Sequence, residues 1–146
     1  MSTRIDHNAI KFTQVSLTVV AVGAFLADLP HLVGVLALVL AVGTARPQAN
    51  LFRVLYQRVV LPRGWLRPHL VDDDPAPHRF AQGVGAALLT GAWGALAAGL
   101  AAPGWALALL VAVLAMVNVV ANFCAGCFLY YQLRRLGVIR RAAEAK

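Results

Sequence analysis

The stretch WALALLVAVLAMVNVVANFCAGCFLYYQL, residues 105–133, joins an apolar segment of membrane-spanning length to the two cysteines of the chain. It follows a Pro-Gly pair and leads into a basic tail. A helix crosses a hydrocarbon core of ~30 Å with about 20 apolar residues. The 146-residue chain is 60% hydrophobic and only 13% charged, a composition typical of integral membrane proteins. The sequence therefore predicts an all-α integral membrane protein.

Four apolar runs come near the length of a membrane span, at residues 11–29, 31–46, 80–102 and 105–129. Short turns join the first run to the second and the third to the fourth. We therefore expect two helical hairpins that pack as a four-helix transmembrane bundle. The second run is the shortest, since about 15 residues of helix cover only about 22 Å. We treat residues 1–146 as a single membrane domain, because the chain is too short for two.

The distribution of basic residues predicts how these spans are oriented. Of the 13 lysines and arginines, two precede or open the first run, six end the second run or lie between it and the third, and five follow the fourth. The positive-inside rule then places both termini and the loop 47–79 in the cytoplasm of a multi-pass protein of the cell (inner) membrane. The net charge of +7 is explained by this topology and by attraction to anionic lipids. We expect the lipid bilayer as a partner and no nucleic acid.

The central loop and the C-terminal tail carry the polar patterns of the chain. In residues 50–61, apolar positions alternate with arginine and glutamine, which predicts an amphipathic helix on the inner leaflet, ended by Pro62. The three aspartates at 72–74 are expected to form a solvated loop. Residues 130–146 are expected to form a basic cytoplasmic tail.

A weak internal repeat relates the two predicted hairpins. Asp6, Lys11, Phe12 and Gln14 recur 68 residues later (74 − 6 = 68) as Asp74, Arg79, Phe80 and Gln82. Both copies begin on the cytoplasmic side, so we interpret the repeat as two parallel hairpins about an axis along the membrane normal. The cysteines occur only in the second copy, which marks its exit as specialised.

Four motifs together resemble one protein family. They are Ile5-Asp6 with Lys11-Phe12-x-Gln14, then Pro77-His78-Arg79-Phe80-Ala81-Gln82-x-Val84-Gly85, then the Asn118–Asn122 stretch, and finally Cys124-x-Gly126-Cys127 with Tyr130. Over nearly its whole length the chain resembles the small bacterial, mainly actinobacterial, membrane proteins grouped as the domain of unknown function DUF4395. The resemblance implies sulfur or thiol chemistry, because members are encoded near thioredoxin-like and sulfurtransferase proteins. Relatives often carry an acidic or polar residue after the second cysteine, where this chain has Phe128.

The cysteine pair is the most reactive group in the sequence. On a continuous helix Cys124 and Cys127 share one face, within reach of each other or of one metal ion. Such a pair can cycle between dithiol and disulfide, or the two small side chains can simply pack against apolar neighbours. A zinc site needs four ligands, and only His69 and His78 are plausible additions. We therefore predict no metal and no cofactor.

The reactivity of the pair depends on where the helix ends. In an unbroken helix the cysteines lie toward the C-terminal end, where the helix dipole disfavours a thiolate. A break at Gly126 would instead let backbone donors and the basic residues Arg134 and Arg135 favour it. Arg79, at the opening of the third run, is a further basic residue of the interface.

These observations lead to three functional hypotheses. The first is thiol redox or sulfur transfer by Cys124 and Cys127 with a soluble thioredoxin-like or sulfurtransferase partner. The second is a transporter or carrier of a small sulfur compound, and the amides that are candidates to line its path are Asn118, Asn122, Gln82 and Gln14. The third is a non-catalytic assembly subunit, because the glycines of the third run would let a second copy or a larger membrane complex approach closely.

Overall fold

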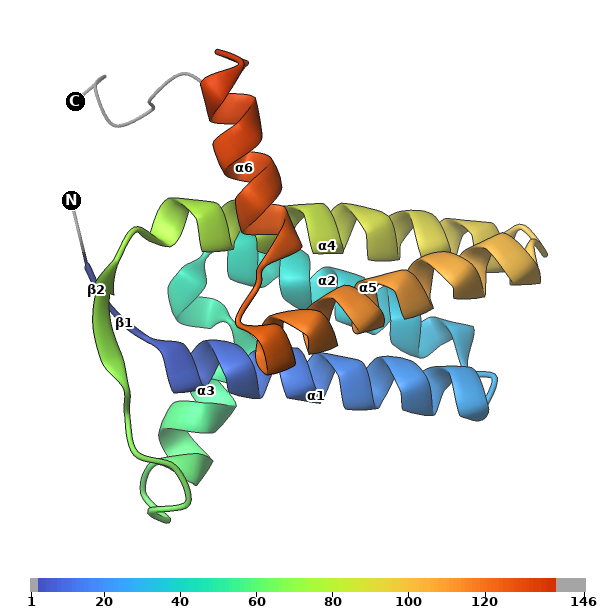
Figure 1. Ribbon diagram of the computed structural model, residues 1–146. Coiled ribbons are helices and arrows are strands. Elements are labelled where there is room, and N and C mark those ends of the chain that lie inside the picture. Colours follow the sequence, from blue (N-terminus) through green and yellow to red (C-terminus); the bar gives the residue numbers. More distant parts are fainter. Residues whose placement is uncertain (1–2, 139–146) are drawn as a thin grey trace.

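The computed structural model describes residues 3–138 as six α-helices, one 3-10 turn, one π-helical segment and two short strands. In chain order these are β1 (Thr3–Asp6), α1 (His7–Leu26), α2 (Pro30–Ala45), η1 (Pro47–Ala49), α3 (Leu51–Leu55), η2 (Tyr56–Val60), β2 (Leu70–Asp73), α4 (Pro75–Ala97), α5 (Ala101–Ala121) and α6 (Ala125–Arg135). Helices α1, α2, α4 and α5 run alongside one another, whereas α3 and α6 leave the bundle near one end (Figure 1).

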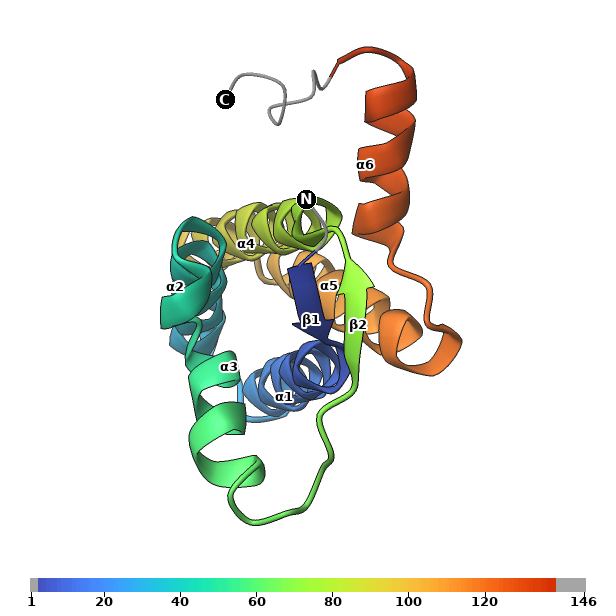
Figure 2. The same cartoon turned by 90° about the vertical axis from the view of Figure 1, so that its left-hand side faces the viewer.

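The four long helices pack around a common centre, as the end-on view shows (Figure 2). Helix α4 contacts α2 and α5, and α1 contacts α5 and α2. The core between them is built mainly from alanine and aliphatic side chains: Leu17, Ala21, Ala24, Val33, Leu36, Ala37, Leu40, Leu89, Ala92, Ala108, Val111, Ala112 and Ala115. Small side chains let helix backbones approach closely, which is how helices gain packing energy in lipid.

Three helices are long and apolar enough to cross a membrane, namely α1, α4 and α5 with 20, 23 and 21 residues. Helix α2 is also apolar but has 16 residues, or about 24 Å of helix. The outer faces expose large apolar side chains, such as Leu26 at 78% and Val120 at 75%. Such continuous apolar exposure suits contact with lipid. The predicted helical fold with membrane-length helices is confirmed, whereas the fourth span stays a prediction.

The expectation of an all-α fold is wrong in one respect, because β1 and β2 form an antiparallel pair. Thr3 lies opposite Asp73, and Asp6 lies opposite Leu70. Each segment leads into a helix through an extended capping residue, Asp6 or Asp74. Two extended segments that meet at the bundle end satisfy each other's backbone donors and acceptors. The pair reaches from α1 to α4 (Figure 2), and part of the expected aspartate loop is therefore a strand.

Both hairpins begin with an aspartate cap, which moves the helix starts toward the N-terminus. The Asp6 carboxylate accepts the amide of the residue two positions ahead at 3.0 Å, and Asp74 does the same at 2.9 Å. An Asp cap satisfies one of the free amides of a first helical turn, and Pro75 adds a residue suited to the first helical position. The helices therefore start at residues 7 and 75, before the apolar runs that were expected to start at 11 and 80.

The predicted fourth span, 105–129, is broken in the structure. Helix α5 ends at Ala121, and Asn122 takes a left-handed conformation with φ 52°. Asparagine enters this conformation at a lower cost than most residues other than glycine. Helix α6 then follows with Cys124 as its N-cap. The cysteines lie at the beginning of a new helix, and the break falls at Asn122 rather than at Gly126.

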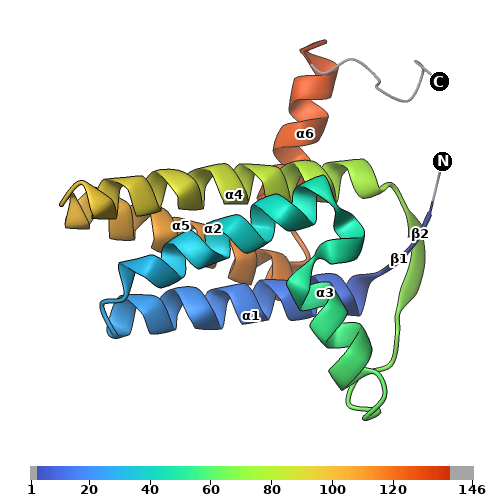
Figure 3. The same cartoon turned by 180° about the vertical axis from the view of Figure 1, so that it is seen from behind.

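Helix α6 packs on α4 at its start and then projects away from the bundle (Figures 1 and 3). Gly126 lies at the contact, where an added Cβ would lie 2.5 Å from the Cβ of Ala81. One turn further on, the ring of Tyr130 lies 5.5 Å from that of Phe80, centroid to centroid. The glycine and the aromatic pair together hold the first turn of α6 against the first turns of α4.

A helical segment is present where the sequence predicted an amphipathic helix at 50–61. The side chain of Asn50 caps α3 by accepting the amide of Phe52 at 3.1 Å. The π-helical segment η2 continues the helix to Val60. Tyr56 is fully buried, with its ring 5.7 Å from that of Phe12 on α1. Contact of this segment with lipid stays a prediction. The predicted tail, 130–146, is α6 in its first part, and its residues 139–146 lie outside the described residues.

Candidate functional site

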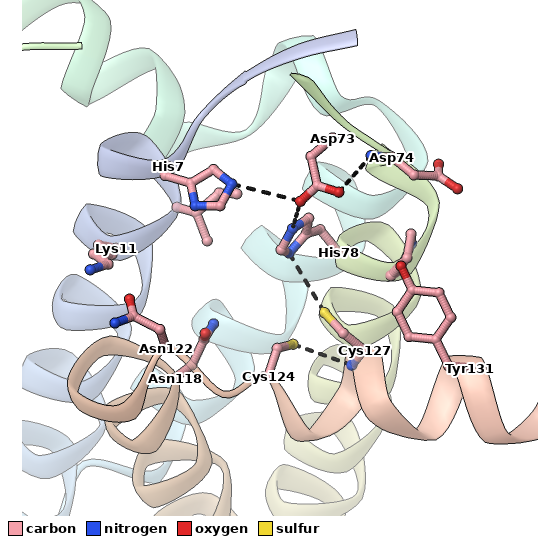
Figure 4. A pocket seen from close by; sticks show the side chains of 12 residues that line it. His7, Lys11, Asp73, Asp74, His78, Asn118, Asn122, Cys124, Cys127 and Tyr131 are labelled. Carbon is pink, nitrogen blue, oxygen red and sulfur yellow. Dashed lines mark hydrogen bonds and ion pairs between the residues drawn. The ribbon is translucent and has the colours of Figure 1, made fainter. Parts of the chain in front are cut away.

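Five side chains from four elements converge at the end of the bundle where β1 and β2 lie (Figure 4). They are His7 on α1, Asp73 on β2, His78 on α4, and Cys124 and Cys127 on α6. They line a cavity of about 240 Å³. Its other polar lining residues are Lys11, Asp74, Asn118, Asn122 and Tyr131. The cavity thus joins nucleophilic, titratable and amide groups that are far apart in the sequence.

Asp73 connects the two histidines of the cavity. Its Oδ2 lies 3.4 Å from Nε2 of His78 and 3.6 Å from Nε2 of His7. Burial acts to raise the pKa of Asp73, but the amide of Asp74, 2.8 Å away, and the two histidines lower it overall. Asp73 is therefore a carboxylate that orients His78. With Nε2 on the carboxylate, the Nδ1 of His78 faces the thiols.

The two thiols and His78 form a compact cluster at the start of α6. The Sγ of Cys124 accepts the backbone N–H of Cys127 at 3.2 Å. The Sγ of Cys127 lies 3.6 Å from Nδ1 of His78. One ligand atom from each of the three residues lies within 4.8 Å of the other two. Cys127 is buried and Cys124 is half-buried, so Cys124 is the more accessible thiol.

In this arrangement the pKa values of the two thiols shift in opposite directions. A hydrogen bond from the thiol of Cys127 is the largest effect on Cys124, and His78 and the Cys127 amide act in the same direction. Against the opposing effect of burial, they lower the pKa of Cys124 to about 5. The same contact with Cys124, followed by burial, raises the pKa of Cys127 far above its usual range. The N-terminus of α6 adds a favourable dipole to a thiolate at Cys124.

The structure brings most of the predicted site residues together. Asn118 and Asn122 line the small cavity beside Cys124 and Cys127. Gln14, Gln82, Arg79, Asn118 and Cys124 line a second, larger cavity of about 740 Å³. Arg134 and Arg135 lie in the last turn of α6, at the opposite end from the cysteines. The expected role of these two arginines beside the thiols therefore has no geometric support.

The larger cavity lies between the helices and combines amide groups with an apolar wall. Gln14, Gln82 and Asn118 supply the amides, and Leu17, Leu40, Leu88, Val111 and Leu114 are among its apolar lining residues. The Nε2 of Gln82 is buried without a hydrogen-bond partner in the described structure. It lies 2.5 Å from the position that a Cβ on Gly43 would occupy. An unpaired buried donor of this kind is costly, and a ligand acceptor would satisfy it.

Sequence reasoning missed His7 and Asp73 as members of the site. His78 was considered only as a further zinc ligand. The pair Asp74-Pro75 is a helix-start signal, and it places Asp73 and His78 on either side of one helix terminus. The same reasoning at Asp6 would have placed His7 in the first turn of α1. Helix capping was thus the available signal.

The fold and this site define a class: a helical protein with membrane-length helices that presents a Cys-x-x-Cys pair at a helix N-terminus, facing a histidine and a carboxylate. Within that class the chain belongs to the DUF4395 family, described as a domain of unknown function, which matches residues 5–135. No curated protein and no solved structure matches the chain. The predicted family is confirmed. The family's description assigns no activity.

Proposed function

We propose that the protein is a membrane thiol–disulfide exchange protein in which Cys124 attacks and Cys127 resolves. The observation that carries this proposal is the position of Cys124 as the N-cap of α6, with its sulfur on the amide of Cys127. A thiol at a helix N-terminus is favoured as a thiolate nucleophile. The buried Cys127 follows within 4.8 Å, ready to attack the sulfur of Cys124.

The exchange proceeds in two balanced steps. The thiolate of Cys124 attacks one sulfur of a partner disulfide, forming a mixed disulfide and releasing one partner thiolate, which takes a proton from solvent. Cys127 then loses its proton and attacks the Sγ of Cys124, which releases the second partner thiolate. Two electrons pass from the cysteine pair to the partner. The pair ends as a disulfide, and the partner ends as a dithiol.

His78 and Asp73 support the second step. Cys127 is the thiol with the raised pKa, so its attack requires a proton acceptor nearby. The Nδ1 of His78, 3.6 Å from its sulfur, has that position. Asp73 on the other ring nitrogen, at 3.4 Å, stabilises the imidazolium that forms. This division of roles parallels the nucleophile, base and orienting carboxylate of other thiol sites.

The proposal places the site at the cytoplasmic face of a four-span protein of the cell membrane, with both termini inside. The distribution of lysine and arginine supports this orientation. The short α2 would reach across a locally thinned bilayer. At that face the half-buried Cys124 would meet a soluble thioredoxin-like partner.

Several matched contacts support the proposed internal repeat. Asp6 and Asp74 cap the first helix of each hairpin with the same geometry. The ring pair Phe12–Tyr56 in the first half has its counterpart in Phe80–Tyr130 in the second, at 5.7 and 5.5 Å. The N-cap of α3 is Asn50, and Cys124 has the equivalent place at α6. In this reading, the thiol site arose by replacing a capping amide in one copy.

Trapping of the mixed disulfide tests the exchange mechanism. Cys127→Ser should retain a covalent adduct with a small disulfide probe or with the partner, because nothing releases it from Cys124. Cys124→Ser is the matched control and should form none. Mass spectrometry after alkylation without reductant should find an intramolecular disulfide in part of the wild-type protein. Equal adduct formation by the two variants would refute the assigned order of attack.

The larger cavity favours a second function, a carrier of a small sulfur compound. About 740 Å³ is enough for a small organic ligand, and the unpaired Nε2 of Gln82 offers it a donor. Net uptake of a labelled sulfur compound into vesicles would support the carrier, since an exchange protein needs no net flux. Gln82→Ala should then reduce uptake and leave adduct formation at Cys124 unchanged. Uptake equal to that of protein-free vesicles would refute the carrier.

A further inference from the structure

We infer that Cys124, Cys127 and His78 form a binding site for one thiophilic divalent cation of the Zn²⁺ type within a single chain. The three residues come from α4 and α6, which Gly126 and Ala81 bring into close contact. Their ligand atoms already lie within 4.8 Å of one another. Sequence analysis named His69 and His78 as plausible additions to the two thiols, and the fold brings His78 into the set.

The distance between Cys127 and His78 fits tetrahedral coordination. With Zn–S of about 2.3 Å and Zn–N of about 2.0–2.1 Å, the nitrogen–sulfur edge of a tetrahedron is about 3.6 Å and the sulfur–sulfur edge about 3.8 Å. The observed distance from Nδ1 of His78 to Sγ of Cys127 is 3.6 Å. The two sulfurs, within 4.8 Å, reach the second edge by a shift of no more than about 1 Å. Rotation of the half-buried Cys124 side chain supplies such a shift.

Asp73 gives the site the outer support that histidine ligands usually have. A histidine that binds a metal through one ring nitrogen commonly donates the N–H of the other to a carboxylate. Here Oδ2 of Asp73 lies 3.4 Å from Nε2 of His78, so Nδ1 is left as the coordinating atom. The amide of Cys127 meanwhile donates to the Sγ of Cys124. The contact with Asp73 orients the coordinating nitrogen before any ion arrives.

The ligand set selects the kind of ion. Two thiolates and one imidazole suit Zn²⁺ and its softer analogue Cd²⁺, whereas Mg²⁺ and Ca²⁺ prefer oxygen. Two thiolates also balance the charge of a divalent ion, and any proton still held by either sulfur is released to solvent on binding. Three protein ligands leave the fourth position for water or another small ligand from the cavity.

His69, the other histidine considered from the sequence, does not join this set. Its ring stacks edge-on against His7 at 6.3 Å between centroids, and its amide donates to Asp6. His7 contacts Asp73 at 3.6 Å and packs its ring edge-on against that of His78, with 6.2 Å between centroids. His69 is therefore a matched control, since it has the same chemistry and lies at the same end of the bundle.

Metal binding and disulfide formation would be alternative states of the same pair, since a bound thiolate is not free to attack. The inference does not rest on the proposed exchange function. A redox-inactive protein would still bind the ion through reduced thiols. A protein without metal affinity would still form the mixed disulfide in Cys127→Ser.

The test uses the full-length, reduced protein in detergent, stripped with a chelator and then titrated with Zn²⁺ or Cd²⁺. We expect one ion per chain by elemental analysis after desalting, and a sulfur-to-cadmium charge-transfer absorption band. Zn²⁺ should also slow alkylation of both cysteines by at least tenfold. One ion per two chains would overturn the site, because the ligands would then come from two copies. Less than one ion per ten chains would also overturn it.

Variants assign the ligands. Cys124→Ser and Cys127→Ser should abolish the cadmium band, and His78→Ala should weaken binding by at least a hundredfold. Asp73→Asn should weaken it by about 10–100-fold, as expected for a carboxylate behind a ligand. His69→Ala should bind as the wild type does. Unchanged affinity in His78→Ala, in protein whose helix content and elution match those of the wild type, would overturn the inference.

Discussion

The lowered pKa of Cys124 makes the rate of its alkylation depend on pH in a way that an ordinary thiol cannot reproduce. With a pKa of about 5, the thiolate is present above pH 5 and is lost as pH falls through that value. In the reduced, metal-free protein, the rate at Cys124 should therefore rise to half its plateau near pH 5. Cys127, with its raised pKa, should remain unreactive throughout the neutral range.

The size of the pKa difference decides at which pH the reactivity of Cys124 should be compared with that of an ordinary thiol. At pH 7 an ordinary thiol with a pKa of ~8.5 is about 3% thiolate, and Cys124 would be about 99%. A less basic thiolate is also a weaker nucleophile, and a Brønsted slope of 0.4–0.5 over about 3.5 pH units lowers its rate roughly 40-fold. The two effects nearly cancel at pH 7. At pH 5.5 the thiolate fractions are about 76% and 0.1%, so Cys124 should react about 20-fold faster than an ordinary thiol.

The assay is alkylation by iodoacetamide between pH 4 and 9, quenched at intervals and resolved for each cysteine by mass spectrometry. His78→Gln should move the midpoint for Cys124 upward, because His78 is one of the groups that lower its pKa. His69→Gln is the control of the same chemistry and should leave the midpoint unchanged. A wild-type midpoint above pH 8, or equal midpoints in the two variants, would refute the assignment of the nucleophile.

Three further predictions concern the elements that build the site. Asn122→Val should destabilise the protein by about 1–2 kcal/mol in thermal unfolding, because a β-branched residue is strained at φ 52°. Asn122→Gly should be tolerated. Equal stability of these two variants would contradict the break in the helix. Gly126→Val should push α6 off Ala81 and move the alkylation midpoint of Cys124 toward that of an ordinary thiol. Gly91→Ala adds a methyl with nothing within 4 Å, and should leave the midpoint of Cys124 unchanged. Asp74→Ala should lower the free energy of unfolding by about 1 kcal/mol by removing the cap of α4. Asp72→Ala removes only an exposed contact to Arg4 at 3.9 Å and should lower it by about 0–1 kcal/mol. A larger loss of stability in Asp72→Ala than in Asp74→Ala would contradict the cap.

Hydrophobic patterning was sufficient to predict the long helices, because each depends on a local run of apolar residues. The caps could also have been read, since Asp6 and the pair Asp74-Pro75 are local helix-start signals. The strands could not be, because four-residue segments such as Thr3–Asp6 carry too weak an alternation to identify. Their pairing depends on the two caps lying at one end of the bundle. That is a property of the fold rather than of either segment.

The cysteines were found from the sequence, but their chemical environment was not. Whether the dipole favours or opposes a thiolate at Cys124 depends on the left-handed conformation of one residue, Asn122. Asparagine permits that conformation without requiring it. The contact of Cys127 with His78 joins residues 49 positions apart. It depends on Gly126 fitting against Ala81. Pairings at such separation follow from helix packing, which one sequence does not determine.

The short pairing of β1 with β2 makes the chemistry of the thiols sensitive to residues 3–6. Residues 3–6 are hydrogen-bonded to the strand that carries Asp73, and Asp73 in turn holds His78 at the thiols. Loss of residues 3–6 would leave both cysteines in place and remove the strand that pairs with the segment carrying Asp73. Chains with and without residues 3–6 would then differ in thiol reactivity while having the same Cys-x-x-Cys sequence.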